Sequence, residues 1–365
     1  MASQQGRGYD RKEGSDMTAP VGDTMRDPLK PGPPCRPAWY ETGKRYAQSD
    51  RRKAQWQLAN TFLPYAILWY VMVRSIHLGY PYAATLLLFV PAAGLLVRIF
   101  IFFHDCCHGS FFASKRANTI LGYVCGILVF TPLEDWRFTH LRHHATYANL
   151  DSRGVGDITT LTVSEYVQAS KSKRIRYCLY RNPLILFFLG PVFYFLMRQR
   201  YPSRKVSKKA RRSVYITNLL ISSVVLSAAW AIGFRTYLLI QLPIILLAAT
   251  MGVWLFYVQH QFDGVYWARK DQWDAMRAAL EGCSFYKLPA VLQWFSGSIG
   301  FHFIHHLWSR IPNYHLKLCY DSVSELQSKE PLTIRASLAS PRLKLWDEKA
   351  QKLVGFGSLK SRTPE

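Results

Sequence analysis

Apolar residues are concentrated in four long blocks along the chain. The blocks cover residues 58–76, 83–103, 214–232 and 237–258. Each is about long enough to cross the hydrocarbon core of a bilayer as a helix, which takes roughly 20 residues. Only short polar turns separate the members of each pair. The pattern therefore predicts two transmembrane helical hairpins.

Two shorter apolar stretches follow a different pattern. They cover residues 118–131 and 183–197, and each is marginal for a full membrane span. A helix lying in the interface and a re-entrant segment are the alternatives. The apolar pattern alone leaves these choices open.

The polar segments carry a large excess of positive charge, with 46 Lys and Arg against 23 Asp and Glu. Basic residues flank the apolar blocks, and the densest run lies within 198–212. This favours an anionic membrane surface over nucleic acid, for which the sequence has no motif. If the four blocks span, the N-terminal segment, 104–213 and 259–365 share the basic face. The positive-inside rule makes that face cytoplasmic.

Histidine is the residue type with the most informative distribution. Two clusters, 140–144 and 302–306, share the spacing HxxHH, and His104 and His108 form an HxxxH pair. Residues three and four apart share one face of a helix, so each cluster is expected to aim its rings at one point. The nine candidate ligands are His104, His108, His140, His143, His144, His260, His302, His305 and His306. His104 and His260 directly follow apolar blocks, so these helices are expected to extend out of the membrane and carry ligands at their ends.

Nine imidazoles are too many for one zinc ion, which takes four ligands. Imidazole binds Fe, Zn, Cu and Ni, and the set contains no thiolate. We interpret it as a two-metal, oxygen-activating centre. With four spans, all nine histidines lie on the basic face, whereas either shorter stretch spanning alone would divide them. This is the main reason to predict four spans.

Other polar residues near the clusters have smaller predicted roles. Asp105 is expected to accept a hydrogen bond from a ligand imidazole and fix its orientation. Asp151 and Asp157 are candidates for the same role, with ordinary turn chemistry around Gly154 and Gly156 as the equal alternative. Cys106 and Cys107 fall between the ligand positions of the first cluster and are expected to pack in the core. Outside the clusters, His315 is expected to be a hydrogen-bonding residue and His77 to have no role in the site.

The pattern HxxxH, HxxHH, HxxHH between paired apolar blocks resembles the membrane fatty acid desaturase family. The likeness covers roughly residues 55–320. Segments 104–112 (HDCCHGSFF), 254–262 (WLFYVQHQF) and 311–315 (IPNYH) are most similar to bacterial and plastid-type acyl-lipid desaturases. The resemblance implies a non-haem diiron centre held by the eight cluster histidines. It places His260 at the family's extra ligand position.

Two features depart from the acyl-CoA branch of that family. Phe256 stands where that branch has an Asn that reaches the metal through water, which puts this ligand in doubt. The first cluster is HxxxH instead of HxxxxH, which favours acyl-lipid substrates. The sequence also has no cytochrome b5-like His-Pro-Gly-Gly motif. The resemblance therefore implies a separate ferredoxin- or flavodoxin-like electron donor.

Together these observations predict an all-α integral membrane protein with four transmembrane helices and a cytoplasmic helical cap carrying three histidine boxes. Residues 1–54 are expected to be a flexible polar and basic tail, 55–320 the desaturase domain, and 321–365 a cytoplasmic C-terminal segment. The implied activity is O2-dependent introduction of a double bond into a membrane lipid acyl chain, in a bacterial inner membrane with the active site on its cytoplasmic face.

Two alternatives to desaturation remain. A hydroxylase or ketolase of the same superfamily would use the same histidines, which do not separate these outcomes. A metal-binding membrane transporter would carry acidic or histidine residues within its spans. The four apolar blocks carry almost none.

Overall fold

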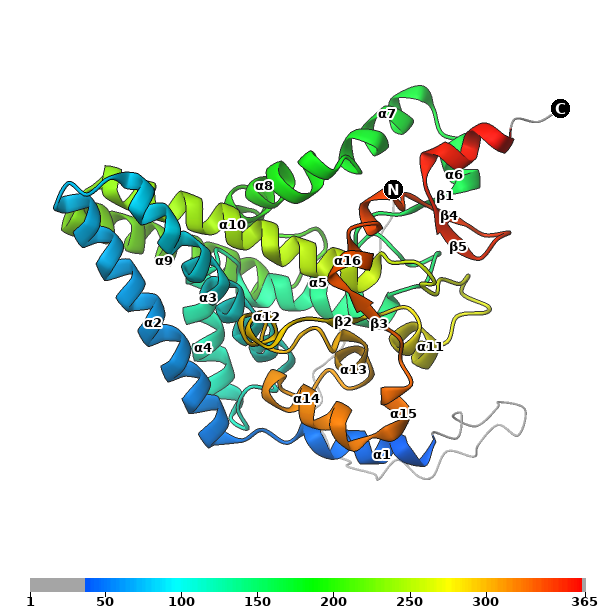
Figure 1. Cartoon of the computed structure of the whole chain (residues 1–365), viewed down its shortest axis with the longest axis horizontal. Helices are drawn as coiled ribbons and strands as arrows, with labels where there is room; N and C mark the ends of the chain where they lie inside the picture. The colour runs from blue at the N-terminus through cyan, green and yellow to red at the C-terminus, as the bar shows by residue number, and fades with distance from the viewer. Residues whose placement is uncertain (1–36, 363–365) are drawn as a thin grey trace, which may run out of the picture. The chain divides into compact units, whose positions relative to one another are not determined.

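The computed structural model describes residues 37–362, and most of the predicted N-terminal tail lies outside the described residues. Within this range the chain is mostly helical (Figure 1). Its longest helices are α2 (Arg51–His77), α3 (Tyr82–His108), α9 (Lys208–Ile232) and α10 (Phe234–His260). They contain the four predicted apolar blocks, in the predicted order. Each helix extends beyond its block, and α3 and α10 carry His108 and His260 as their last residues.

Local signals set the ends of these helices. The Asp50 side chain accepts hydrogen bonds from the first backbone N–H groups of α2, and Ser207 does the same for α9. Gly109 follows α3 with φ 67°, a left-handed conformation that ends the helix. Glycine adopts this conformation readily because it has no Cβ. Gly233 separates α9 from α10 with φ 86° and ψ 136°, a different positive-φ conformation that glycine adopts readily. Gly79, with φ 75°, lies in the turn between α2 and α3.

Three of the described helices, α3, α9 and α10, are long and apolar enough to cross a membrane. Two bent helix pairs raise the number of candidate spans to five if each pair counts as one. One pair joins α4 (Lys115–Leu128) to α5 (Leu133–Thr146) at 99°. The other joins α7 (Lys171–Tyr180) to Ile185–Arg200 at 65°. The two shorter apolar stretches of the sequence lie within these bent pairs. Helix α2 has the same length as α3 but is less apolar, and it is not one of these three candidate spans.

The long helices bury an apolar core between α2, α3 and α10 and turn other apolar side chains outward. Buried members include Met72 on α2, Phe89 and Phe102 on α3, and Ile240 and Ile244 on α10. Exposed large side chains on the same helices are Leu63, Ile67, Tyr70, Leu87, Val90, Leu219, Leu226 and Trp230. An outward apolar surface of this extent is typical of lipid-facing helices.

Shorter elements make up the remainder of the described chain. The helices are α1 (Ala38–Lys44), α6 (Val163–Val167), a π-helical stretch (Ile185–Leu189), α8 (Gly190–Leu196), α11 (Ala275–Leu280), α12 (Ala290–Phe295), α13 (His302–Leu307), α14 (Asn313–Ser322), α15 (Ser324–Gln327) and α16 (Ile334–Ser337). The strands are β1 (Leu161–Thr162), β2 (Phe285–Lys287), β3 (Pro331–Thr333), β4 (Leu345–Asp347) and β5 (Lys352–Val354).

These strands depart from the predicted all-α class. In one sheet β4 is parallel to β1 and antiparallel to β5. In the other sheet β2 is parallel to β3. The strands have two or three residues each, too few for a period-two pattern in the sequence. They attach the C-terminal region to β1 and β2, so the chain after residue 320 contains strands as well as helices.

Candidate metal centre

All nine candidate histidines meet at the ends of four helices. Helix α3 supplies two rings, α5 three, the end of α10 one and α13 three. They form two sets, each with ligand nitrogens within 4.8 Å of one another. The first set is His104, His108, His140, His144 and His305. The second set is His143, His260, His302 and His306.

The division between the sets corrects the expectation that each cluster aims its rings at one point. On α5, His140 and His144 join the first set while His143 joins the second. On α13 the assignment is reversed, because two rings join the second set and His305 joins the first. Adjacent helical residues point about 100° apart, so the i+3 and i+4 members of HxxHH diverge to either side of the helix face. Each HxxHH helix therefore contributes to both sets.

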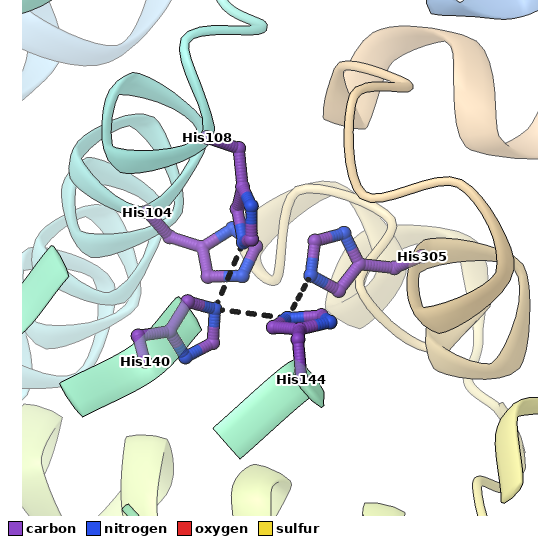
Figure 2. Close-up of side chains that lie close together, drawn as sticks. All are labelled: His104, His108, His140, His144 and His305. Atoms are coloured by element: carbon purple, nitrogen blue, oxygen red, sulfur yellow. Dashed lines mark hydrogen bonds between the residues drawn. The ribbon is translucent and has the colours of Figure 1, made fainter. Parts of the chain in front are cut away.

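Figure 2 shows the first set, with rings from α3, α5 and α13 pointing toward one another. The Nε2 atom of His140 lies 2.9 Å from that of His108 and 3.1 Å from that of His144. The Nε2 atom of His305 lies 3.0 Å from that of His144. The His104 ring centroid lies 4.4 Å from that of His305. The rings thus surround one common point.

The second set is centred on His260. Its Nε2 atom lies 3.1 Å from that of His143 and 3.0 Å from that of His302. The Nε2 atom of His306 lies 3.1 Å from that of His302. Helix α10 therefore ends within the site, which gives the histidine after the fourth apolar block a central position.

One buried carboxylate orients a ligand in each set. His104 Nδ1 donates to Asp105 Oδ1 at 3.1 Å, and His143 Nδ1 donates to Asp157. An imidazole that donates from Nδ1 keeps the lone pair on Nε2, directed into its set. Both Asp105 and Asp157, candidates for this role in the sequence, thus contact an imidazole of one set. Nitrogen lone pairs this close repel one another unless a cation lies between them.

Burial keeps the imidazoles of α13 in the neutral form that binds metals. It lowers the pKa of His302, His305 and His306 well below the usual 6.5, and repulsion from neighbouring imidazoles lowers it further. Ligation therefore requires no deprotonation near neutral pH. Two closed groups of imidazoles without thiolate fit a pair of first-row transition metal ions.

An apolar cavity of about 410 Å³ leads to both sets. Its walls come from α3, α5, α8 and α10, with Leu96, Phe100, Ile245 and Ala248 among the lining residues. At one end it reaches His104, His140 and His302. The Trp136 ring, which also lines the cavity, stacks on His140 with centroids 4.2 Å apart. The volume and lining are typical of a site for an apolar ligand.

The family model for fatty acid desaturases matches residues 79–337 of this chain. The chain is also 44% identical over 315 residues to a fatty acid desaturase of Bacillus subtilis, with 86% of this chain and 89% of the relative covered. The chain belongs to the fatty acid desaturase family. The matched region includes all nine histidines of the two sets.

More distant relatives of this desaturase carry names that specify lipid substrates. The sn-1 acyl-lipid omega-3 desaturase (ferredoxin) of Synechocystis is 28% identical over 250 residues, covering 64% of this chain and 65% of the relative. The sn-1 oleoyl-lipid 12-desaturase of Anabaena variabilis is 25% identical over 307 residues, covering 77% and 79%.

Several polar residues of the desaturase lie outside both sets. Asp151 accepts hydrogen bonds from the Arg269 guanidinium at 2.6 Å and the Lys270 backbone at 2.9 Å, so its role is in a surface turn. Cys106 and Cys107 are buried in the core of α2, α3 and α10, as expected. They are not members of either set.

The two histidines predicted to lie outside the site do so. His315 Nδ1 donates to the Tyr46 carbonyl at 3.2 Å, which is the hydrogen-bonding role expected of it. His77 Nε2 lies 3.1 Å from the Ile232 carbonyl and so connects the turns of the two hairpins.

Sequence reasoning missed one fully buried cation near the second set. Arg181 is 0% exposed and donates to the Tyr257 hydroxyl at 3.2 Å, Gln261 Oε1 at 2.9 Å and the Leu343 carbonyl at 2.8 Å. These bonds fix the end of α10 on both sides of His260. No motif marks Arg181, because its partners are far apart in the sequence.

Phe256 lies against the second set. Its ring centroid is 5.4 Å from that of His143 and 5.1 Å from that of His260. A phenyl ring offers no ligand atom, so the side chain at this position does not supply the water-mediated ligand of the acyl-CoA branch. It gives the second set an apolar neighbour that also lines the cavity.

Proposed function

We propose that this protein is an acyl-lipid desaturase that uses O2 to introduce a double bond into an acyl chain of a membrane lipid. The observation that carries the proposal is the apolar cavity that reaches His104, His140 and His302. Apart from Asp157 and the histidines its lining is mainly apolar, which suits a saturated acyl chain. The lipid substrates named for the cyanobacterial relatives agree with this choice.

The proposed metals are two irons, one in each set of imidazoles. Bound irons would use two electrons from a donor to activate O2, so that it could remove hydrogen from an unactivated methylene. The acyl chain loses two hydrogens, and O2 leaves as two waters after taking up two further protons. Asp105 and Asp157 keep the His104 and His143 rings in position for ligation. The apolar walls around Phe100 and Trp136 exclude water from the reacting carbons.

The proposed topology has four spans, with both sets at the cytoplasmic face of a bacterial inner membrane. Helix α2 is the span that joins α3, α9 and α10 in this arrangement, because it has 27 residues and turns Leu63, Ile67 and Tyr70 outward. Its polar side chains lie in the first two turns and also within block 58–76, at Asn60, Thr61, Arg74 and Ser75. In this arrangement α4–α5 and α7–α8 are bent segments on the cytoplasmic side, and Lys and Arg predominate there.

The proposed electron donor is a separate ferredoxin- or flavodoxin-like protein. Two plant and cyanobacterial relatives carry ferredoxin in their names. The exposed residues Lys208, Lys209, Arg211 and Arg212 form a basic surface at the start of α9. A basic surface attracts acidic proteins as well as anionic lipid, so donor association should weaken with salt.

Fatty acid analysis of an expressing strain tests the proposal. The host has defined, mainly saturated lipids, and its fatty acids are measured by gas chromatography with mass spectrometry. New unsaturated acids are expected in the lipid fraction. Hydroxylated acids would support the hydroxylase alternative, and unchanged lipids with a zinc-only protein would contradict the proposal.

A further inference from the structure

A second cavity lies between helices α2, α9 and α10 and the end of α4. It has a volume of about 470 Å³, and its lining includes Ala66, Val73, Val224 and Ala228. None of the nine histidines lines it. Gln241, which does, precedes His260 by 19 residues on α10, or roughly 28 Å along the helix. We call this cavity the lipid groove, for the reasons that follow.

Two polar side chains that line the groove, Tyr237 and Gln241, have no hydrogen-bond partner among the described residues, although the Tyr237 ring contacts that of Trp69. Gln241 is 7% exposed and Tyr237 is 6% exposed. In the described part of the chain, neither side chain makes a hydrogen bond. The Gln241 amide has two N–H donors, and leaving buried donors unpaired costs free energy. A ligand with an acceptor oxygen would satisfy both side chains.

The position of these side chains along α10 identifies the acceptor. Tyr237 lies three residues and Gln241 seven residues after Phe234, the first residue of α10, so they lie roughly 5 and 10 Å from the helix start. In the four-span arrangement the start of α10 lies at the surface of the membrane that faces away from the cytoplasm. This depth is the edge of the hydrocarbon core, where the acyl ester carbonyls of glycerolipids lie. The rest of the lining is mostly apolar and suits the attached hydrocarbon chain.

We propose that the lipid groove binds one acyl chain of an outer-leaflet glycerolipid, whose ester carbonyl accepts hydrogen bonds from Gln241 and Tyr237. This inference rests on the proposed four-span arrangement but not on the proposed chemistry. The site is separate from the cavity that leads to the histidines, so the bound lipid is not the substrate.

The corner between α4 and α5 connects this lipid to the substrate cavity. Leu128 and Phe130 line the lipid groove, whereas Val129 between them lines the substrate cavity. Phe130 holds this corner with φ 55°, a conformation that is uncommon for a bulky residue and needs support from its surroundings. A lipid chain in the groove packs behind the wall that Val129 gives to the substrate cavity.

Native mass spectrometry of the purified full-length chain tests the proposal with two probes. One is dioleoyl phosphatidylglycerol, and the other is its diether analogue, which has the same headgroup and chains but no ester carbonyl. We expect the first diester molecule to bind about fivefold more tightly than the diether, the effect of about one neutral hydrogen bond. Gln241→Leu should remove this preference. Equal binding of both probes by the unaltered protein would overturn the proposal.

Two further variants separate the groove from the general lipid surface. Leu242→Ala changes the next residue of α10, which is exposed and does not line the groove, and should keep the preference for the diester. Ala228→Phe fills the groove and should lose it. Loss in Leu242→Ala, or retention in both Gln241→Leu and Ala228→Phe, would contradict the assignment. If the purified protein instead retained an isoprenoid lipid without an ester as its tightly bound molecule, this assignment of the groove would also be contradicted. The readout is lipid binding, so a failed desaturation assay leaves it unaffected.

Discussion

Asn313 donates two hydrogen bonds to one oxygen of Asp105, from its backbone N–H at 2.7 Å and from its side-chain amide at 2.9 Å. The other oxygen of Asp105 accepts from His104 in the first set. Gln57 on α2 donates in turn to the Asn313 side chain at 2.8 Å. A relay of side chains from α2 and α14 therefore sets the orientation of a proposed iron ligand on α3.

Replacing Asn313 by Leu should loosen the first metal. The substitution removes the side-chain donor that holds Asp105 in place, and the buried carboxylate then orients His104 less well. Loss of such an outer partner typically costs 10- to 100-fold in metal affinity or activity. Iron retained during dialysis against a chelator measures the effect. Asn218→Leu is the matched control, because Asn218 pairs with Arg200 away from both sets. Equal retention by both variants would refute the positioning role of Asn313.

The sequence predicted the four long helices and the nine histidines that the structure brings together, and it offered Asp105 and Asp157 as candidates to orient them. It was not sufficient for Asn313, because no local pattern shows that residues 105 and 313 meet. Helical spacing gave the shared face of HxxHH, but the division of His143 and His305 from their neighbours depends on where a second metal would lie. These features arise from packing between distant segments, which periodicity does not encode.

Membrane crossing was predictable only in part. Long apolar blocks identified α3, α9 and α10, whereas α2 has more polar residues along its length. Its proposed role as a span rests on its outward side chains. The bends between α4 and α5 and before α8 lie at short breaks in the apolar pattern. Such breaks mark a bend but do not give its angle.

Gly252 offers a way to block the substrate cavity without touching a ligand. It lines the cavity on α10, and an added Cβ would meet no atom within 4 Å. Gly252→Leu should therefore project into the cavity, while the helix gains about 1 kcal/mol in propensity. We expect product formation to fall at least about tenfold, as misplacement of a substrate allows, with iron content unchanged.

Leu246→Phe is the control for this variant, because Leu246 is exposed on the same helix and does not line the cavity. It should desaturate like the unaltered protein. If Gly252→Leu gave the same product yield as Leu246→Phe, the acyl chain would have to bind elsewhere.

Lys344 should make stability depend on pH in the alkaline range. Burial, with repulsion from Arg181, lowers its pKa from 10.5 to about 8. Between pH 8 and pH 10.5, Lys344 binds more protons in the unfolded chain than in the folded chain. The free energy of unfolding therefore rises with pH across this window, and this gain is lost as pH falls back to about 8. The Tm of Lys344→Met relative to the unaltered protein should therefore fall as pH rises from 8 to 10.5. A constant difference would show that Lys344 keeps its usual pKa.

One substitution in each set should abolish the product. His305→Ala removes a first-set ring and His143→Ala a second-set ring, and both metals are needed if they act together on O2. Each variant should still insert into the membrane, which fractionation checks. His77→Ala, at the hairpin turns, should retain activity. Normal product yield in either set variant would count against a shared centre.

The iron content of the purified protein, measured by mass spectrometry of the elements, tests the central claim most directly. Two closed sets of imidazoles predict two irons per chain in the unaltered protein, and about one or none in His305→Ala or His143→Ala. A protein that binds only zinc, or that keeps its full iron content in both variants, would contradict a two-iron centre built from these histidines.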